Sequence, residues 1–164
     1  MIVAAAVAPP MYASSALISL SNGAGSVYDD PQKASAMLVS VEFLHRALPW
    51  VRELPTVRAE PLGRTLIRLT VQGDSPVLTH KWAEQLASQF VKESNALLEK
   101  RRRELSLEVR SLLTVTAYAS EGKRVEALGR YFTASNDLAA LREAKVVVVN
   151  PPRKLSWWQR IFSR

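Results

Sequence analysis

The feature that most constrains the fold is a strand that leads directly into a long helix near the middle of the chain. Residues 64–72 alternate between apolar and polar side chains, which predicts a strand with one buried face. That face would consist of Ile67, Leu69 and Val71. The turn at 73–76 ends the strand, and apolar residues then recur at helical spacing as far as Leu113. A helix that begins at Pro76 or Thr79 and is unbroken to Leu113 would be about 55 Å long at 1.5 Å per residue, which exceeds a compact domain of this size. We therefore expect the helix either to project as a stalk or to break.

The remaining patterns predict the other elements of the fold. They are a strand over residues 11–20, a loop over 21–26, a helix that begins at Asp29-Asp30-Pro31 and ends at Pro49, an edge strand over 55–61, helical segments over 120–131 and from Ser135-Asn136-Asp137 onward, and a buried strand over 146–149 ended by Asn150-Pro151-Pro152. The resulting order is β-α-β-β-α-β, which predicts an α+β, ferredoxin-like domain with an extended helix. In that plan the first and last strands are antiparallel neighbours, so both chain ends leave from the same edge of the sheet.

The composition excludes cysteine-based sites and indicates which partners the charge of the chain would suit. The chain has 164 residues, enough for one domain with a real core, and no cysteine, which excludes disulfides, cysteine zinc sites and thiol catalysis. Its formal net charge is +7. A basic balance suits an anionic lipid, a nucleic acid or an acidic glycan, and the alternative is a soluble domain with ordinary surface lysines and arginines.

The two ends of the chain carry the signals for a membrane. Residues 1–8 are apolar and uncharged, too few to span a bilayer, and they are either a buried strand or the end of a transmembrane helix. Residues 153–164 form a basic, aromatic tail in which Trp157, Trp158, Arg160, Phe162 and Arg164 suit a membrane interface. The alternative for this tail is a short amphipathic helix that packs on its own domain. These two ends divide the chain into segments 1–8, 9–152 and 153–164.

A dense basic run lies within the predicted long helix. Its members are Lys100, Arg101, Arg102 and Arg103. Consecutive helical residues point about 100° apart, so the run wraps the helix and cannot form a single stripe. It is either a solvated collar or a contact for another subunit or an acidic polymer.

Patterns typical of catalysis are weak. His45 and His80 lie on separate predicted helices without partners at the spacing of a metal site or a catalytic dyad. The glycine-rich segment 21–26 lacks the Gly-Lys-Ser/Thr ending of a phosphate-binding P-loop. An RNA-recognition module would need aromatic residues on its central strands, and the strand over 64–72 has none. We therefore expect no catalytic residues, no metal and no cofactor, and these strands do not favour nucleic acid as a partner.

The succession of segments resembles the Wzz-type chain-length determinants, the polysaccharide co-polymerases of bacterial surface glycans. The resemblance covers residues 9–152. It rests on Pro9-Pro10-Met11-Tyr12 at the entry to the first strand, Ala36-Met37-Leu38-Val39-Ser40 in a helix, the strand and acidic-proline turn at 64–76, the helix at 82–91, and the closing strand and prolines at 146–152.

This resemblance implies a scaffold and not an enzyme. It implies a homo-oligomer at the periplasmic face of the bacterial inner membrane that sets the length of a surface glycan, such as O-antigen of lipopolysaccharide or an exopolysaccharide, beside a polymerase. Two alternatives stay open. One is a ring-forming or adaptor domain of another cell-envelope assembly, and the other is a basic module that binds nucleic acid.

Overall fold

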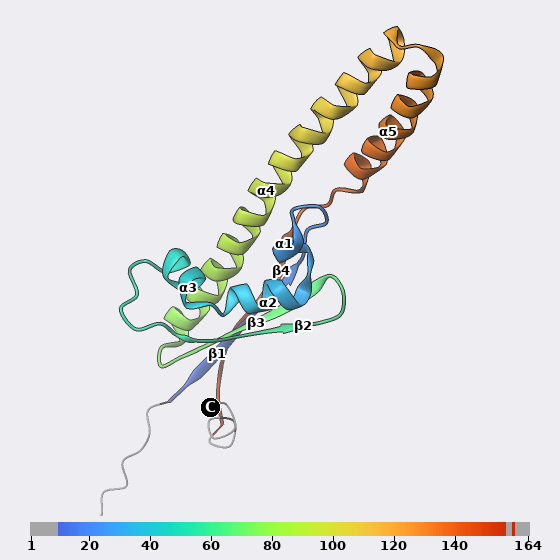
Figure 1. Cartoon of the computed structure of the whole chain (residues 1–164). Coiled ribbons are helices and arrows are strands. Elements are labelled where there is room, and N and C mark those ends of the chain that lie inside the picture. Colours follow the sequence, from blue (N-terminus) through green and yellow to red (C-terminus); the bar gives the residue numbers. More distant parts are fainter. Residues whose placement is uncertain (1–9, 157–158, 160–164) are drawn as a thin grey trace, which may run out of the picture.

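The structure consists of a four-stranded sheet from which a two-helix hairpin projects (Figure 1). It is a computed structural model that describes residues 10–156 and residue 159. The elements are β1 (Tyr12–Ser19), α1 (Ser26–Asp29), α2 (Pro31–Leu38), α3 (Val41–Ala47), β2 (Thr56–Pro61), β3 (Leu66–Gly73), α4 (Pro76–Tyr118), α5 (Glu121–Ala140) and β4 (Lys145–Lys154). The predicted α+β class, with an extended helix, is confirmed.

The sheet has the order β2-β3-β1-β4, and every neighbouring pair is antiparallel. The prediction that the first and last strands are neighbours is confirmed, since Tyr12 of β1 lies opposite Lys154 of β4. Beyond these strands the Leu155 amide donates to the Met11 carbonyl at 2.8 Å. The two chain ends therefore leave the sheet together, at the end of the molecule opposite to the hairpin (Figure 1).

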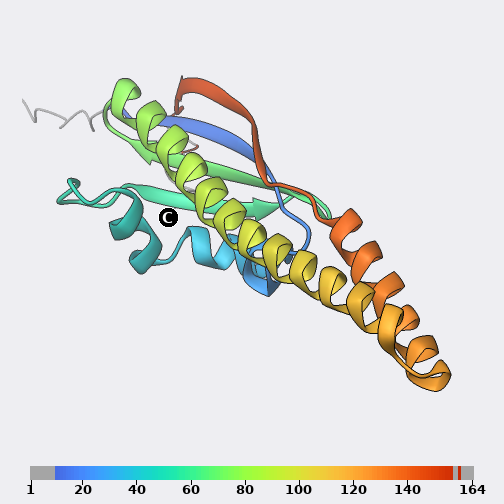
Figure 2. The same cartoon turned by 90° about the horizontal axis from the view of Figure 1, so that it is seen from above.

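One face of the sheet carries the core. The predicted face of β3, Ile67, Leu69 and Val71, is fully buried, as are Ala16 and Ile18 of β1. Helices α2, α3 and α4 pack on this face, and Figure 2 shows α4 running from the sheet to the far end of the hairpin. The helical residues of the core are Ala34, Leu38, Phe43, Leu44, Ala47, Ala83, Leu86, Ala87 and Phe90. The other face of the sheet takes no part in this core.

Helix α4 does not break. It comprises 43 residues, or about 65 Å at 1.5 Å per residue. Ser75 caps it by accepting from the Leu78 amide, and Pro76 begins it without the loss of a hydrogen bond. Its first half lies on the sheet, and its second half runs beside α5 as the projecting hairpin (Figures 1 and 2). Of the two outcomes expected from the sequence, the stalk is the one observed.

Two helical predictions were wrong. The helix expected from Pro31 to Pro49 is two helices, because the Ser40 hydroxyl donates to the Met37 carbonyl and accepts from the Phe43 amide, which ends one helix and caps the next. The third helix expected at 135–137 does not start there. Helix α5 is continuous through this segment because Ala127 and Ala134, two turns apart, are both buried along the hairpin.

The last strand also differs from its prediction. Asn150-Pro151-Pro152 does not end β4, which continues to Lys154. The strand lies at the edge of the sheet, where proline removes no ladder hydrogen bond on the outer side. For the same reason Val147 and Val148 are 56% and 43% exposed, although the valine run predicted a fully buried strand.

The prediction for residues 1–8 lies outside the described residues. Within the described residues, no helix is both long and apolar enough to cross a bilayer.

Candidate functional site

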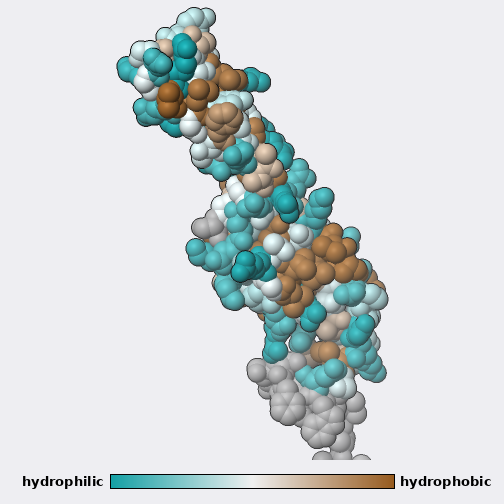
Figure 3. All heavy atoms as spheres, turned by 90° about the vertical axis from the view of Figure 1, so that its right-hand side faces the viewer, coloured by the Kyte–Doolittle hydropathy of each residue, from teal (hydrophilic) through white to brown (hydrophobic). Residues whose placement is uncertain are grey.

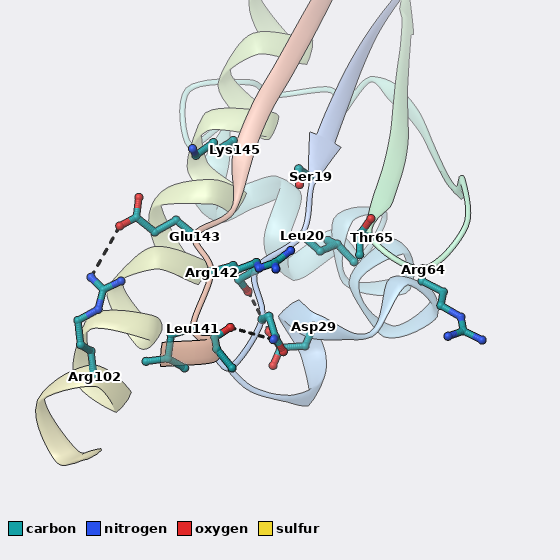
Figure 4. Close-up of a pocket in the computed structure, with 13 residues that line it drawn as sticks. Ser19, Leu20, Asp29, Arg64, Thr65, Arg102, Leu141, Arg142, Glu143 and Lys145 are labelled. Carbon is teal, nitrogen blue, oxygen red and sulfur yellow. Dashed lines mark hydrogen bonds and ion pairs between the residues drawn. The ribbon is translucent and has the colours of Figure 1, made fainter. Parts of the chain in front are cut away.

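A basic groove lies where the hairpin meets the sheet. This junction groove has a volume of about 750 Å³. It brings together the end of β1, the β2–β3 turn, the middle of α4 and the linker from α5 to β4 (Figure 4). Its lining residues are Ser19, Leu20, Ser21, Asn22, Asp29, Arg64, Thr65, Arg102, Ala140, Leu141, Arg142, Glu143 and Lys145.

Positive charge dominates the junction groove. Four of its lining residues are cationic, and they come from three parts of the chain: Arg64 from the β2–β3 turn, Arg102 from α4, and Arg142 and Lys145 from the return to β4. Figure 4 shows Arg64 and Arg102 on opposite sides, with Arg142 between them. Arg102 lies 3.7 Å from Glu143. Within the described residues Arg64, Arg142 and Lys145 form no ion pair, so their charges are available to an anion.

Backbone hydrogen bonds fix the linker that carries Arg142. Asn22 and Arg142 exchange two of them, with N–O distances of 2.9 and 3.1 Å. Asn95 of α4 holds the end of this linker, because its side chain accepts a hydrogen bond from the Ala144 amide and donates one to the Ala144 carbonyl. Gly23 has a φ of +98°, a left-handed backbone conformation that favours glycine, and a Cβ there would meet the Leu141 side chain. The groove is therefore built on a fixed frame.

The glycine-rich segment beside the groove is closed by a carboxylate of the chain itself. Oδ2 of Asp29 accepts from the amides of Gly23 and Gly25, and Oδ1 accepts from the Ala24 amide and the Ser21 hydroxyl, at 2.9–3.1 Å. Amides in such a nest commonly bind phosphate. Here the amides already have an anion, which is the physical reason that this loop is not a phosphate site.

The predicted basic run divides between different surroundings. Arg102 pairs with Glu99 and lines the junction groove, and Arg101 lies 3.7 Å from Glu104. Lys100 and Arg103 are exposed. The run therefore surrounds the helix as expected from its spacing. Its contact with a polymer or a second subunit stays a prediction. The predicted membrane-interface residues Trp157, Trp158, Arg160, Phe162 and Arg164 lie outside the described residues.

The two histidines have different surroundings. His45 is exposed. His80 lies 3.3 Å from the Ser14 hydroxyl, a contact that the sequence did not predict. The Ser14 hydroxyl donates to the Asn150 carbonyl at 2.7 Å, so His80 does not receive its proton as a general base would. In the part of the chain that the structure describes, no three acidic, histidine or cysteine residues are grouped to hold a metal.

A carboxylate cluster joins three helices instead of forming an acid–base site. Glu93 of α4 accepts a bidentate pair of hydrogen bonds from Arg46 at 2.9 and 3.0 Å, and others from Gln89 and Tyr28. Burial opposes ionisation of Glu93, but the hydrogen bonds from Arg46 and Gln89 outweigh it and lower the pKa of the carboxyl. Burial, with the adjacent Glu93 charge, raises the pKa of Tyr28. The lowered pKa keeps Glu93 ionised as an acceptor and the raised pKa keeps the Tyr28 phenol protonated as a donor, so both shifts favour the hydrogen bonds that join the helices.

A second candidate surface is an apolar stripe on α5. Val125, Leu128 and Phe132 occur at positions i, i+3 and i+7, so they share one helical face. Their exposed fractions are 68%, 39% and 61%. Figure 3 shows apolar atoms gathered on the hairpin and again lower on the molecule. The spacing of this stripe was readable in the sequence, but its exposure was not.

Comparisons with known proteins give similarities of fold outline. No family model matches the chain, and no curated protein matches it. Among solved structures, a fragment of WzzB, a polysaccharide co-polymerase from Salmonella Typhimurium, has 12% identity and a TM-score of 0.40 over 86% of this chain and 94% of its own. A full-length bacterial polysaccharide co-polymerase has 12% identity and a TM-score of 0.32 over 96% and 82%. The periplasmic domain of Shigella flexneri WzzB has 10% identity and a TM-score of 0.32 over 86% and 100%. Similarities of this size assign neither an activity nor a partner to this chain.

Proposed function

We propose that the chain is a non-catalytic scaffold that regulates the chain length or the export of a bacterial surface polysaccharide. It acts as a homo-oligomer beside a glycan polymerase, at the periplasmic face of the inner membrane. The observation that carries the proposal is the projecting α4–α5 hairpin with its exposed apolar stripe, at the opposite end of the molecule from both chain ends. An enzyme of this size would need a converging set of reactive groups, whereas a spacer needs length and a contact surface.

The contact between α4 and α5 is too narrow to bury all the apolar side chains of the hairpin. The seam between α4 and α5 buries chiefly Leu105, Leu112, Ala127 and Ala134. Two alanines in four positions leave a narrow seam, and the larger side chains of the stripe stay on the outside. Exposed apolar patches on a soluble domain commonly mark an interface. Further copies of the hairpin would complete a helical bundle, in which each helix buries its apolar face.

Polar substitution of the stripe is expected to dissociate the oligomer. The variant carries Val125→Gln, Leu128→Gln and Phe132→Gln, which removes apolar contact area but keeps good helix formers. We expect native mass spectrometry and sedimentation of the full chain, extracted from membranes, to show a shift from oligomer to monomer. In cells lacking the wild-type gene, the same variant is expected to lose the narrow length distribution of the surface glycan on gels.

The matched control carries three glutamines at exposed polar positions of the same helix. Its changes are Lys123→Gln, Glu126→Gln and Asn136→Gln. We expect the control to keep both the oligomer and the glycan length distribution of the wild type. A wild-type chain that is monomeric under all conditions would contradict the proposal, and so would a stripe variant that is monomeric yet still sets the normal distribution.

The junction groove supports an acidic polysaccharide as the polymer. Its unpaired cations, Arg64, Arg142 and Lys145, line an open groove in which a chain with repeated carboxylates would meet several charges at once. Arg102, a member of the predicted basic run, lines the same groove. The hydroxyls and the amide of Ser19, Thr65 and Asn22 are of the kind that hydrogen-bond sugar hydroxyls.

Removal of the groove cations is expected to weaken binding of a soluble polyuronate. A variant with Arg64→Gln, Arg142→Gln and Lys145→Gln is expected to raise the Kd about tenfold or more, on the scale of one or two lost charge-assisted hydrogen bonds. Titration calorimetry at two salt concentrations measures this, because a charge-driven complex weakens with salt. The control variant, Lys92→Gln, Arg110→Gln and Lys123→Gln, loses the same charge elsewhere. Equal loss in both variants, or equal binding of neutral dextran, would contradict a groove site.

The finer points of fold and location belong to the same proposal. The element order and the sheet order β2-β3-β1-β4 support a ferredoxin-like plan in which a helical pair replaces the second helix. The joint exit of both chain ends supports a membrane-proximal sheet with the hairpin pointing away. The basic aromatic tail, as a sequence, supports an interfacial position for that end.

A further inference from the structure

The face of the sheet that lies away from the helices carries a trough of its own. This open-face trough has a volume of about 670 Å³. It lies beside the start of β1 and the end of β4, where both chain ends leave the sheet, and so at the opposite pole from the hairpin. Its lining residues are Ala13, Ser14, Ser15, Arg68, Thr70, Asn150, Pro151, Arg153, Lys154, Leu155 and Gln159.

Strand register explains why a hollow forms here. Ser15 of β1 lies opposite Thr70 of β3 and opposite Asn150 of β4, so short polar side chains make its floor. Ala13, two residues earlier on the same face, faces Arg153 across an irregularity in the register. Arg68 is two residues from Thr70 and shares its face. Arg68 and Arg153 therefore border a floor of small residues on this face, and Lys154, opposite Tyr12, lines the trough from the end of β4.

The charges of the trough are uncompensated. Arg68, Arg153 and Lys154 are exposed, and none of them forms an ion pair within the described residues. None of the lining residues is a carboxylate. Glu60 of β2 is the register partner of Arg68, yet the two form no salt bridge. Three cations of one sign in one hollow raise the local concentration of anions.

The hydrogen-bond donors are of the kind that a tetrahedral oxyanion needs. The Ser15 hydroxyl accepts from the Asn150 amide at 3.0 Å, which leaves its own hydrogen free to donate. The Thr70 hydroxyl has no hydrogen-bond partner in the described part of the chain and can donate as well. Two arginines offer planar forks that match phosphate oxygens, and Lys154 adds a point charge.

We propose that the open-face trough binds a phosphate-bearing anion, with Arg68, Arg153 and Lys154 as its charge partners and Ser15 and Thr70 as hydroxyl donors. Three cations favour a phosphate with two negative charges over a single carboxylate. The volume has room for the phosphate together with the group that it esterifies. The site is separate from the junction groove and does not depend on the proposed function.

Titration of the full chain with small anions tests the proposal. We expect inorganic phosphate and pyrophosphate to bind at low salt, and acetate at the same concentration to bind at least about tenfold more weakly. Amide shifts in the NMR spectrum should locate the binding at Ser15, Thr70 and Asn150. The trough variant, Arg68→Gln, Arg153→Gln and Lys154→Gln, is expected to raise the Kd for pyrophosphate about tenfold or more.

Vesicle flotation distinguishes the source of the phosphate. Binding to phosphatidylglycerol vesicles, absent with phosphatidylcholine and lost in the trough variant, would assign a lipid headgroup. Phosphate binding without a trough-dependent vesicle interaction would assign a soluble phosphate ester. The control variant Lys92→Gln, Arg110→Gln and Lys123→Gln has the same net charge as the trough variant. The proposal is overturned if phosphate and vesicles both fail to bind, or if the two variants lose binding equally.

Discussion

Replacement of Phe90 by alanine is expected to lower the free energy of unfolding by about 3–5 kcal/mol. Phe90 of α4 is fully buried and belongs to the core that joins the helices to the sheet. Its ring also lies 5.3 Å from the ring of Tyr28, centroid to centroid. The substitution removes this contact and leaves a cavity that fixed strands cannot close. A loss of this size corresponds to a melting temperature lower by roughly 10 °C in a domain of this length.

Urea denaturation followed by circular dichroism measures the change. The control is Leu97→Ala on the same helix, where the side chain is 42% exposed. We expect this control to cost less than about 1 kcal/mol, since little apolar area returns to water. Phe90→Leu, which keeps most of the buried volume, should lie between the two. Similar losses at Phe90 and Leu97 would mean that α4 is not anchored to the sheet as described.

Replacement of Asp29 by asparagine is expected to cost about 2–3 kcal/mol, although the two side chains have nearly the same shape. The Asp29 carboxylate accepts four hydrogen bonds, three of them from the amides of Gly23, Ala24 and Gly25. An asparagine presents an amide group to some of these donors, which leaves them unsatisfied. The glycine-rich segment should then open and disturb the edge of the junction groove.

Hydrogen exchange locates this effect within the chain. Exchange at Gly23, Ala24 and Gly25 is expected to accelerate more than at the core amides of β3. The matched control is Asp74→Asn, since Asp74 is exposed and its side chain has no hydrogen-bond partner within the described residues. The control should change the free energy of unfolding by less than about 0.5 kcal/mol. Unchanged exchange in the Asp29 variant would show that the carboxylate does not hold the loop.

The parts of the fold that were predicted are those in which local pattern and burial agree. The alternation at 64–72 predicted β3, because this central strand has one face in the core. Asp30 and Pro31 predicted the start of α2, and the Asp30 side chain does cap it. The valine run of β4 was misread, because a run of apolar residues is equally compatible with a buried strand and with an edge strand. Only the sheet order decides between them.

The candidate sites were less predictable, because they depend on distant contacts. Arg64, Arg142 and Lys145 are ordinary single cations in the sequence, and the return of the chain from α5 to β4 brings them together. The dense run at 100–103 was the predicted contact for a polymer or subunit, yet only Arg102 of the run lines the groove. The role of Asp29 was missed because the helix cap next to it, Asp30, gave a sufficient reason for an acidic pair.

The continuity of α4 has a mechanical consequence. The first half of the helix packs on the sheet as far as the buried Leu98, and the helix continues without a break from there to Tyr118. The part beyond Leu98 is about 30 Å long at 1.5 Å per residue, so a tilt of about 10° at Leu98 moves its far end by about 5 Å. A small change in the angle between α4 and the sheet would thus be magnified into a larger displacement at the tip of the hairpin.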